Sequence, residues 1–357
     1  MIKLPRSTDT TRILPLDDSL RVFHIGGYWR RENDTVRHMM LGLRQAGAQV
    51  FEYSTDEHRE ALDTDGRRYD RGTTCPVWLR WEIVGPVLEE YEPHLVICNA
   101  GGLAFRPDVA ANLRRSRHLL GIALSDPAVF EPTTRHIAPL FDLFLTNHPA
   151  TVPLYEALGA TAAPLRFGTN PEFFQPAAAR PELACEVLVM GHAHPDRIDP
   201  VKRLTREFQL HVYGEGWDKH GIPSRGLIFG EDSLAALASA FCVVVFHRSP
   251  HGDPLIKPSL FDFTAAGALV VTNYDRAVEP YFVFGDEIVG FRSEEDLVPT
   301  IRRLLDHPQE AERVRRAGRA RTLRDHTWAS VWRAIFQDQR VRTTGQRTTD
   351  NQTGHIF

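Results

Sequence analysis

The sequence is poor in cysteine and lysine, and it lacks long apolar runs. Its four cysteines are far apart, and their spacing fits neither a zinc site nor a disulfide framework. This excludes a small disulfide-stapled fold and favours a reducing, cytoplasmic compartment. The first residues lack the apolar core of an export signal, and no apolar run of about 18 residues occurs. We therefore expect no membrane-spanning helix.

Basic residues are nearly all arginine, since only four of the 42 are lysine. The formal net charge is -4 and no domain-sized segment is strongly basic, so we expect no nucleic-acid partner. The most basic run, at 313–324, has only a thin apolar stripe beside it. This favours a solvated helix face over weak peripheral contact with a membrane.

The glycine fingerprint of NAD-binding proteins is missing as well. The first predicted strand, at 20–27, ends at Gly26 and Gly27 and continues into Tyr28, which does not fit GxGxxG. A segment with apolar residues at helical spacing follows at 35–46. A strand, a glycine turn and a helix in this order are typical of the start of a doubly wound α/β domain.

The length of 357 residues and the repeated alternation of strands and helices predict two domains. We expect one Rossmann-like domain over 20–175 and a second over 176–327, joined by a linker rich in proline and alanine. A helix over 328–339 carries one apolar stripe and is expected to cross back to the first domain. The segments 1–19 and 340–357 are polar and predicted to be flexible.

Within the first domain we expect an exposed insertion at 54–74 and a helix at 78–91. Further short strands end at Asn99, followed by Gly101, and shortly before Asp126. Because the carboxyl ends of parallel strands line the ligand crevice of such domains, these three residues are candidates for a site. Asp126 could instead cap a helix or occupy a turn before Pro127.

The most informative stretch lies at 255–273 in the second domain. It reads as a loop, a short helix opened by Pro258, a stop at Gly267 and a buried strand. The free N–H groups at the start of such a helix favour phosphate. Lys257 precedes the helix and Asp262 lies one turn inside it, which suits a diphosphate and a ribose. Asp262 could instead be the carboxylate of a capping box, and Lys257 a surface lysine.

Six motifs in order resemble the GT-B glycosyltransferases, in particular the group typified by the spore maturation protein CgeB. They are VLVMG followed by Arg197, HVYGEGW at 211–217, GLIFGEDSLAALASAF at 226–241, LFDFTAAGALVVTN at 260–273, GDEIVGFRSEEDL at 285–297 and DHTWASVW at 325–332. As architecture the resemblance covers most of 20–336.

The resemblance implies that a sugar is transferred from a nucleotide donor, which is a substrate, and that no further cofactor is needed. The donor is expected in the second domain, where the matching positions are Gly191, His192, Arg197, Tyr213, Gly214, His247, Lys257, Ser259, Leu260 and Asp262. The acceptor is expected in the first domain, at Gly26, Gly27, Tyr28, Asn99 and Gly101.

One position departs from the resemblance. Many relatives carry arginine directly before the LFD triplet, and Ser259 stands there, so we expect Lys257 to supply the positive charge. The same departure leaves open a nucleotide-sugar-binding protein that has lost catalysis. A nucleotide-sugar epimerase on the same fold would need an acid/base cluster that the sequence does not reveal.

The mechanism stays open between inversion and retention. Inversion needs a general base, for which His24 or Asp126 is the candidate, whereas retention relies on support of the leaving diphosphate. His24 alternates with apolar residues, which also fits a structural histidine. A DxD triplet at 63–65 and an HxH pair at His192 and His194 are candidate metal ligands, but we expect no metal.

Overall fold

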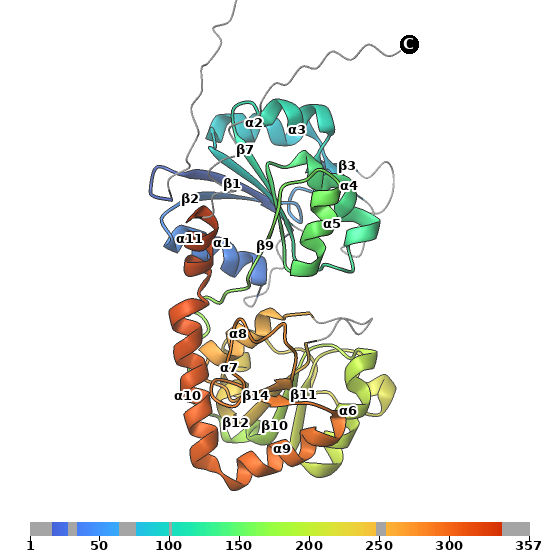
Figure 1. Ribbon diagram of the computed structural model, residues 1–357, viewed down its shortest axis with the longest axis vertical. Coiled ribbons are helices and arrows are strands. Elements are labelled where there is room, and N and C mark those ends of the chain that lie inside the picture. The colour runs from blue at the N-terminus through green and yellow to red at the C-terminus, as the bar shows by residue number, and fades with distance from the viewer. Residues whose placement is uncertain (1–15, 28–33, 64–75, 100–101, 248–254, 338–357) are drawn as a thin grey trace, which may run out of the picture.

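The computed structural model describes residues 16–27, 34–63, 76–99, 102–247 and 255–337, which form two α/β domains (Figure 1). The first domain contains a six-stranded parallel sheet and the second a five-stranded parallel sheet. Helices lie against both sheets. The predicted α/β class with two Rossmann-like domains is confirmed.

The sheet of the first domain has the order β2-β1-β5-β7-β8-β9. Central strands such as β5 are buried along their whole length, which explains why they read as continuous apolar runs. The strands are β1 (Arg21–Gly26), β2 (Gln49–Ser54), β5 (Leu95–Asn99), β7 (His118–Ala123), β8 (Leu143–Thr146) and β9 (Ala162–Pro164). The helices are α1 (Thr35–Gln45), α2 (Trp81–Tyr91), α3 (Pro107–Leu113), α4 (Arg135–Ile137) and α5 (Val152–Ala157).

A small third sheet corrects two expectations in this domain. Its strands are β3 (Leu62–Asp63), β4 (Val77–Leu79) and β6 (Leu103–Phe105). Strand β4 occupies the start of the segment that was predicted to be helical from 78, because Val77 and Leu79 are buried at a spacing of two and pair with β6. The described part of the predicted insertion is also partly buried, since Ala61 is fully covered.

The sheet of the second domain has the order β11-β10-β12-β13-β14. Its strands are β10 (Cys185–Met190), β11 (Leu210–Tyr213), β12 (Ala240–Val245), β13 (Val270–Asn273) and β14 (Val289–Phe291). The helices of the C-terminal half are α6 (Pro195–Glu207), α7 (Gly230–Ser239), α8 (Pro258–Ala265), α9 (Glu294–Asp306), α10 (Pro308–Asp325) and α11 (Trp328–Gln337). Helix α8 lies on the side of its domain that faces the first domain (Figure 1).

The chain passes between the two domains twice, and the two passages pair with each other. The first follows β9, and the second joins α10 to α11. Thr169 and Thr327 form a parallel bridge, in which Thr169 N donates to His326 O at 2.9 Å and Trp328 N donates to Thr169 O at 2.9 Å. This paired segment is called the hinge below.

Helix α11 returns to the first domain and packs against α1. The indole Nε1 of Trp332 donates to the carbonyl oxygen of Met39 at 2.8 Å. A Cβ placed on Gly42 would lie 2.2 Å from the Cβ of Trp328, so only glycine allows the two helices to approach this closely. Within the described residues, no helix is long and apolar enough to cross a membrane.

Candidate functional site

The carboxyl edge of the second sheet gathers a glycine turn and two helix starts. Strands β10 and β12 are neighbours, and the chain leaves them toward α6 and α8, respectively. Gly191 has φ +134° and Gly214 has φ +138°, and a Cβ on Gly214 would lie 2.1 Å from Gly191 O. The turn therefore needs glycine at both positions and brings backbone close to any ligand at this edge.

Two basic side chains lie beside this turn. Arg197 on α6 is 8% exposed, and its Nη1 donates to His192 O at 3.1 Å. The same Nη1 would lie 3.2 Å from a Cβ on Gly191. Burial, followed by repulsion from Arg197, lowers the pKa of Lys257 to about 8. Because Arg197 repels the charged form of the partly buried Lys257, an anion beside the two side chains would be favoured.

His247 follows β12 and lies near Arg197 and Lys257. It is fully buried, and neither ring nitrogen has a hydrogen-bond partner among the described residues. Burial, with repulsion from Lys257 as the next cause, lowers its pKa to about 3, so the ring is neutral at physiological pH. Its backbone is fixed, because His247 N donates to Asn273 Oδ1 at 2.8 Å. The cations Arg197 and Lys257, together with the neutral His247, are called the cation cluster below.

Asp196 is a member of this region that the sequence did not indicate. Its side chain is 11% exposed, it lies 3.8 Å from Arg197 Nε, and its oxygens accept no hydrogen bond from the part of the chain that the structure describes. It offsets part of the positive charge of the cluster. An aspartate in the first turn of a helix looks like an ordinary helix start, so no sequence signal set it apart.

Asp262 lies on α8 and faces the hinge. Its Oδ1 accepts a hydrogen bond of 2.7 Å from Thr169 Oγ1. Burial raises the pKa of Asp262 to about 8, and the hydrogen bond from Thr169 works against that rise. The capping-box alternative is wrong, because the helix is capped at Lys257 and no side chain bonds its free N–H groups within the described residues.

The other residues predicted to bind the donor differ in burial and in their contacts. Leu260 is fully buried in the core, and Tyr213 contributes its carbonyl oxygen to Gly191 N at 2.8 Å. His192 is exposed, and its Nδ1 accepts from Glu215 N at 3.3 Å. Ser259 is partly exposed in the first turn of α8. Their roles toward a donor stay predictions.

In the first domain, His24 and Asn99 meet at the ends of β1 and β5. A Cβ on Gly26 would lie 2.9 Å from His24 Cε1 and 3.0 Å from Asn99 O, so the three residues are in contact at one edge. Asn99 is 1% exposed, and neither polar atom of its amide has a partner among the described residues. Gly27 is buried beside them, whereas Tyr28 and Gly101 lie outside the described residues.

The pKa of His24 resembles that of His247. Burial, followed by repulsion from Arg44, lowers it to about 3. The imidazole is therefore neutral at physiological pH and holds a proton weakly. That makes His24 a poor general base in the state that the structure describes.

Asp126 is buried among hydroxyl groups and faces its own domain. Burial raises the pKa of its carboxyl, and hydrogen bonds oppose the rise. The carboxylate accepts hydrogen bonds from Thr146 at 2.6 Å, Tyr155 at 2.7 Å, Thr151 at 3.4 Å and Thr134 at 3.5 Å. This geometry is typical of a structural carboxylate that ties β7 to β8 and α5.

Neither candidate metal motif assembles a ligand set within the described residues, where no group of three His, Cys, Asp or Glu side chains converges. Asp63 pairs with Arg106 at 2.5 Å, and Thr64 and Asp65 of the DxD triplet lie outside the described residues. His192 faces Glu215 at 3.7 Å. The expectation that no metal binds stays a prediction.

The arginines of the basic run on α10 have partners inside the protein. Arg319 donates to Ala265 O at 3.0 Å, and Arg315 donates to Phe241 O at 3.0 Å. Arg313, Arg316, Arg321 and Arg324 pair with acidic side chains. Because these arginines are paired within the protein, the helix face is better suited to packing on its own domain than to binding a membrane.

Comparison with known proteins agrees with this geometry. A family model described as "Glycosyl transferase-like" matches residues 196–337, the part that contains α6, α8 and the cation cluster. No curated protein sequence matches the chain.

Several solved structures are similar over nearly the whole chain. Sucrose-phosphate synthase from Thermosynechococcus elongatus has a TM-score of 0.61 at 16% identity, over 89% of this chain and 98% of its own. AviGT4, a glycosyltransferase involved in avilamycin A biosynthesis, has a TM-score of 0.58 at 16% identity, over 91% of this chain and 98% of its own. HepE from Anabaena, in complex with UDP and glucose, has a TM-score of 0.57 at 11% identity, over 88% of this chain and 98% of its own.

These similarities show the fold. The chain has the two-domain GT-B architecture, and its residues 196–337 match the glycosyl transferase-like model. The family match and the fold together support a transferase.

Proposed function

We propose that the protein transfers a glycosyl group from a nucleotide-sugar to a hydroxyl group of an acceptor, without a metal ion. The observation that carries this proposal is the cation cluster of Arg197, His247 and Lys257 beside the glycine turn at Gly191. It lies in the region that the glycosyl transferase-like family model matches. Protein cations can neutralise the leaving diphosphate, which is the role that a metal has in other transferases.

In this proposal the diphosphate lies between the Gly191 turn and the start of α8. Arg197 and Lys257 contribute charge, and His247 supplies a ring nitrogen that becomes a cationic donor once an anion raises its pKa. Lys257 takes the place of the arginine that resembling proteins carry two residues later, at the position of Ser259. A point charge in place of a planar fork fits the diphosphate less rigidly.

Asp262 is the proposed partner of the ribose hydroxyls. Its Oδ1 accepts a hydrogen bond from Thr169, which leaves Oδ2 for a ligand. UDP is the first nucleotide to test, because HepE, which has a similar fold, was solved with UDP and with UDP-glucose.

The acceptor is proposed to lie against the ends of β1 and β5. Support comes from Asn99, a buried amide whose donor and acceptor atoms are both unpaired among the described residues. Such a group recognises a neutral hydroxyl, which can both accept and donate. We leave Asp126 out of the chemistry, because its lone pairs already accept four hydroxyl hydrogen bonds.

The chemistry is proposed to depend mainly on the leaving group. The weak basicity of His24 favours a scheme in which the cation cluster stabilises the departing diphosphate and no strong protein base acts. His24 then orients the acceptor hydroxyl.

Within the GT-B fold we propose a place in the CgeB-like group, on the strength of the six ordered motifs. A reducing, cytoplasmic setting is supported by the free, buried thiols of Cys98, Cys185 and Cys242.

Calorimetric titration with UDP, GDP, dTDP and CMP, each with and without EDTA, tests the donor site. We expect one nucleotide to bind with a dissociation constant that EDTA leaves unchanged. Absence of binding by all four overturns the proposal, and a loss of binding in EDTA overturns its metal-free form.

Turnover separates the remaining alternatives. Incubation of the corresponding nucleotide-sugar with a panel of hydroxyl acceptors should release nucleoside diphosphate and form a glycoside. Binding without release favours a protein that has lost catalysis, and conversion of the sugar while it stays attached to the nucleotide favours an epimerase.

A further inference from the structure

The hinge contacts the proposed donor site through one hydroxyl group. Thr169 is fully buried in the first passage between the domains, and its Oγ1 donates to Asp262 Oδ1 at 2.7 Å. Among the described residues it is the only group that hydrogen-bonds this carboxylate. A residue outside both sheets therefore fixes the orientation of a side chain on α8.

Backbone hydrogen bonds on both sides hold Thr169 in place. Its N–H and carbonyl both pair across the hinge, with His326 and Trp328. A Cβ on the preceding Gly168 would lie 2.7 Å from Trp328 N, so the two passages touch along their backbones. With the backbone held at both ends, the side chain of Thr169 has little freedom in where it directs its hydroxyl group.

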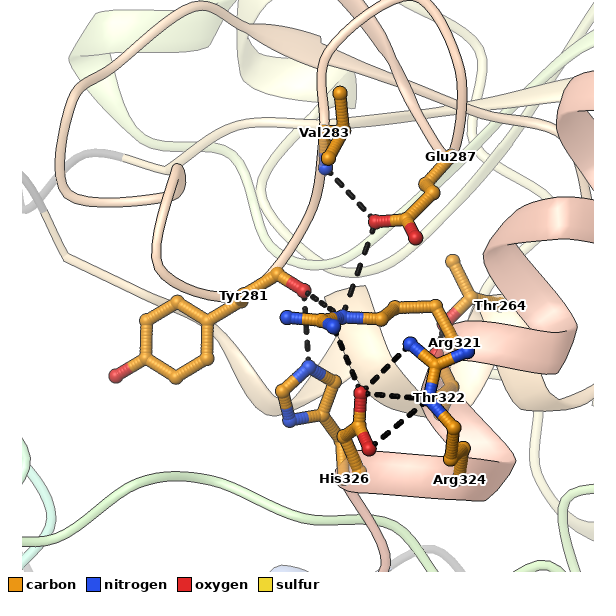
Figure 2. A network of polar contacts seen from close by, with 9 residues as sticks. Thr264, Tyr281, Val283, Glu287, Arg321, Thr322, Arg324 and His326 are labelled. Atoms are coloured by element: carbon orange, nitrogen blue, oxygen red, sulfur yellow. Dashed lines mark hydrogen bonds and ion pairs between the residues drawn. The ribbon is translucent and has the colours of Figure 1, made fainter.

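A polar network holds the other side of the hinge in place (Figure 2). The Nε2 of His326 and the Nε of Arg321 each donate to Tyr281 O at 2.9 Å. Arg321 also pairs with Asp325 at 2.8 Å. Because the carbonyl oxygen of His326 receives the Thr169 N–H, this network extends through the hinge to the carboxylate.

Charged and titratable groups near α8 do not replace this hydroxyl. Arg319 on α10 donates to the carbonyl oxygen of Ala265, His326 packs against Phe261 with ring centroids 5.3 Å apart, and Lys257 stands at the helix start. In the part of the chain that the structure describes, none of them hydrogen-bonds the carboxylate of Asp262.

We propose that Thr169 is a positioning residue for the donor, whose hydroxyl group orients Asp262 so that the free oxygen of the carboxylate receives the ribose hydroxyls. This inference rests on the proposed function and adds to it a residue in the hinge, outside the region that the family model matches. The part of the donor that Thr169 affects is the ribose diol already proposed for Asp262, and not the diphosphate.

The experiment compares UDP with 2′,3′-dideoxy-UDP, which keeps the base and the diphosphate but lacks both ribose hydroxyls. We expect Thr169→Val, which keeps the shape and removes the hydroxyl, to weaken UDP binding about tenfold, the effect of one hydrogen bond. Binding of 2′,3′-dideoxy-UDP should not change. Thr169→Ser should restore UDP binding to within about twofold of the parent, because it keeps the donor.

A double-mutant cycle links the two residues. Asp262→Asn should weaken UDP binding at least as much as Thr169→Val, and adding Thr169→Val to Asp262→Asn should cost little more. Melting temperatures of all variants show whether they are folded. If Thr169→Val does not fold, Thr169→Ala serves in its place with the same expectations.

Equal losses for the two nucleotides would mean that Thr169 only supports the hinge, and no loss for either would mean that it has no part in binding. Each result overturns the inference and leaves the diphosphate site standing. Equal affinity of the parent protein for the two nucleotides overturns the ribose contact, and with it this inference. Failure of the parent protein to bind any of the four nucleotides overturns the proposed function itself.

Discussion

Two regions of this protein bury charged groups at the carboxyl ends of parallel strands, and they differ in whether those groups have partners. Asp126 in the first domain accepts hydrogen bonds from four hydroxyl groups. The cation cluster in the second domain holds Arg197 and Lys257 near a histidine whose ring nitrogens are unpaired among the described residues.

The difference indicates what each region is for. A buried charge that is fully hydrogen-bonded ties elements together, and its removal leaves the donors unsatisfied. Buried cations that repel one another cost stability, and an anionic ligand relieves that cost. Variants at Asp126 should therefore affect folding, whereas variants in the cluster should affect binding.

The largest effect is expected for Asp126→Ala. Losing the carboxylate removes the acceptor that lies closest to the buried hydroxyl of Thr146, at 2.6 Å, and an acceptor 2.7 Å from that of Tyr155, and it leaves a cavity. We expect the free energy of unfolding to fall by about 3 kcal/mol or more. Urea denaturation followed by circular dichroism measures it, and Asp126→Asn, which keeps the shape and one acceptor oxygen, should lose less. An unfolding free energy like that of the parent protein would remove Asp126 from the structural side of the comparison.

Arg197→Gln should weaken UDP binding by about tenfold to a hundredfold, since a hydrogen bond to a charged group contributes about 1.5–3 kcal/mol. The free energy of unfolding should stay constant or rise, because a poorly paired buried cation is removed. Lys202→Met, on the same helix, is the matched control and should leave binding unchanged. A loss of stability without a loss of affinity would contradict the assignment.

Acid should destabilise the protein through His247 and His24. The pKa of each is lowered to about 3 in the folded state, below the usual value of 6.5, so the unfolded state takes up the proton first. The contribution of the two histidines to stability is therefore full above pH 6.5 and falls below it, by roughly 1 kcal/mol per pH unit for each histidine. His247→Gln should flatten the stability profile between pH 6.5 and 5, and an unchanged slope would argue against a neutral His247.

The smallest effect is expected for Lys257→Arg. The pKa of Lys257 is lowered to about 8. In the parent protein, Lys257 should therefore lose its positive charge as the pH rises through 8, and the affinity for UDP should fall with it. Arginine stays charged in this range. The measured quantity is the ratio of the UDP dissociation constants of the parent protein and Lys257→Arg. Because Asp262 titrates in both proteins, this ratio reports Lys257 alone. The ratio should change severalfold between pH 7 and 9. A ratio independent of pH would place Lys257 away from the diphosphate.

The sequence by itself determined the two α/β domains, the start of α8 and the residues that surround it. These follow from local patterns: apolar runs for buried strands, helical spacing, and the Pro258 and Gly267 signals at the ends of one helix. Most candidate site residues lie at the end of a strand or within a few residues after it, and the carboxyl ends of parallel strands share one edge.

Only the tertiary structure decided which of these residues are paired. Thr169 and Asp262 are 93 positions apart, and Asp126 meets Tyr155 across 29 positions, so no local pattern could connect them. The strand at Val77–Leu79 likewise depends on its neighbour β6. Burial and pairing come from contacts between distant segments, and they distinguish the satisfied carboxylate of Asp126 from the unpaired histidine at His247.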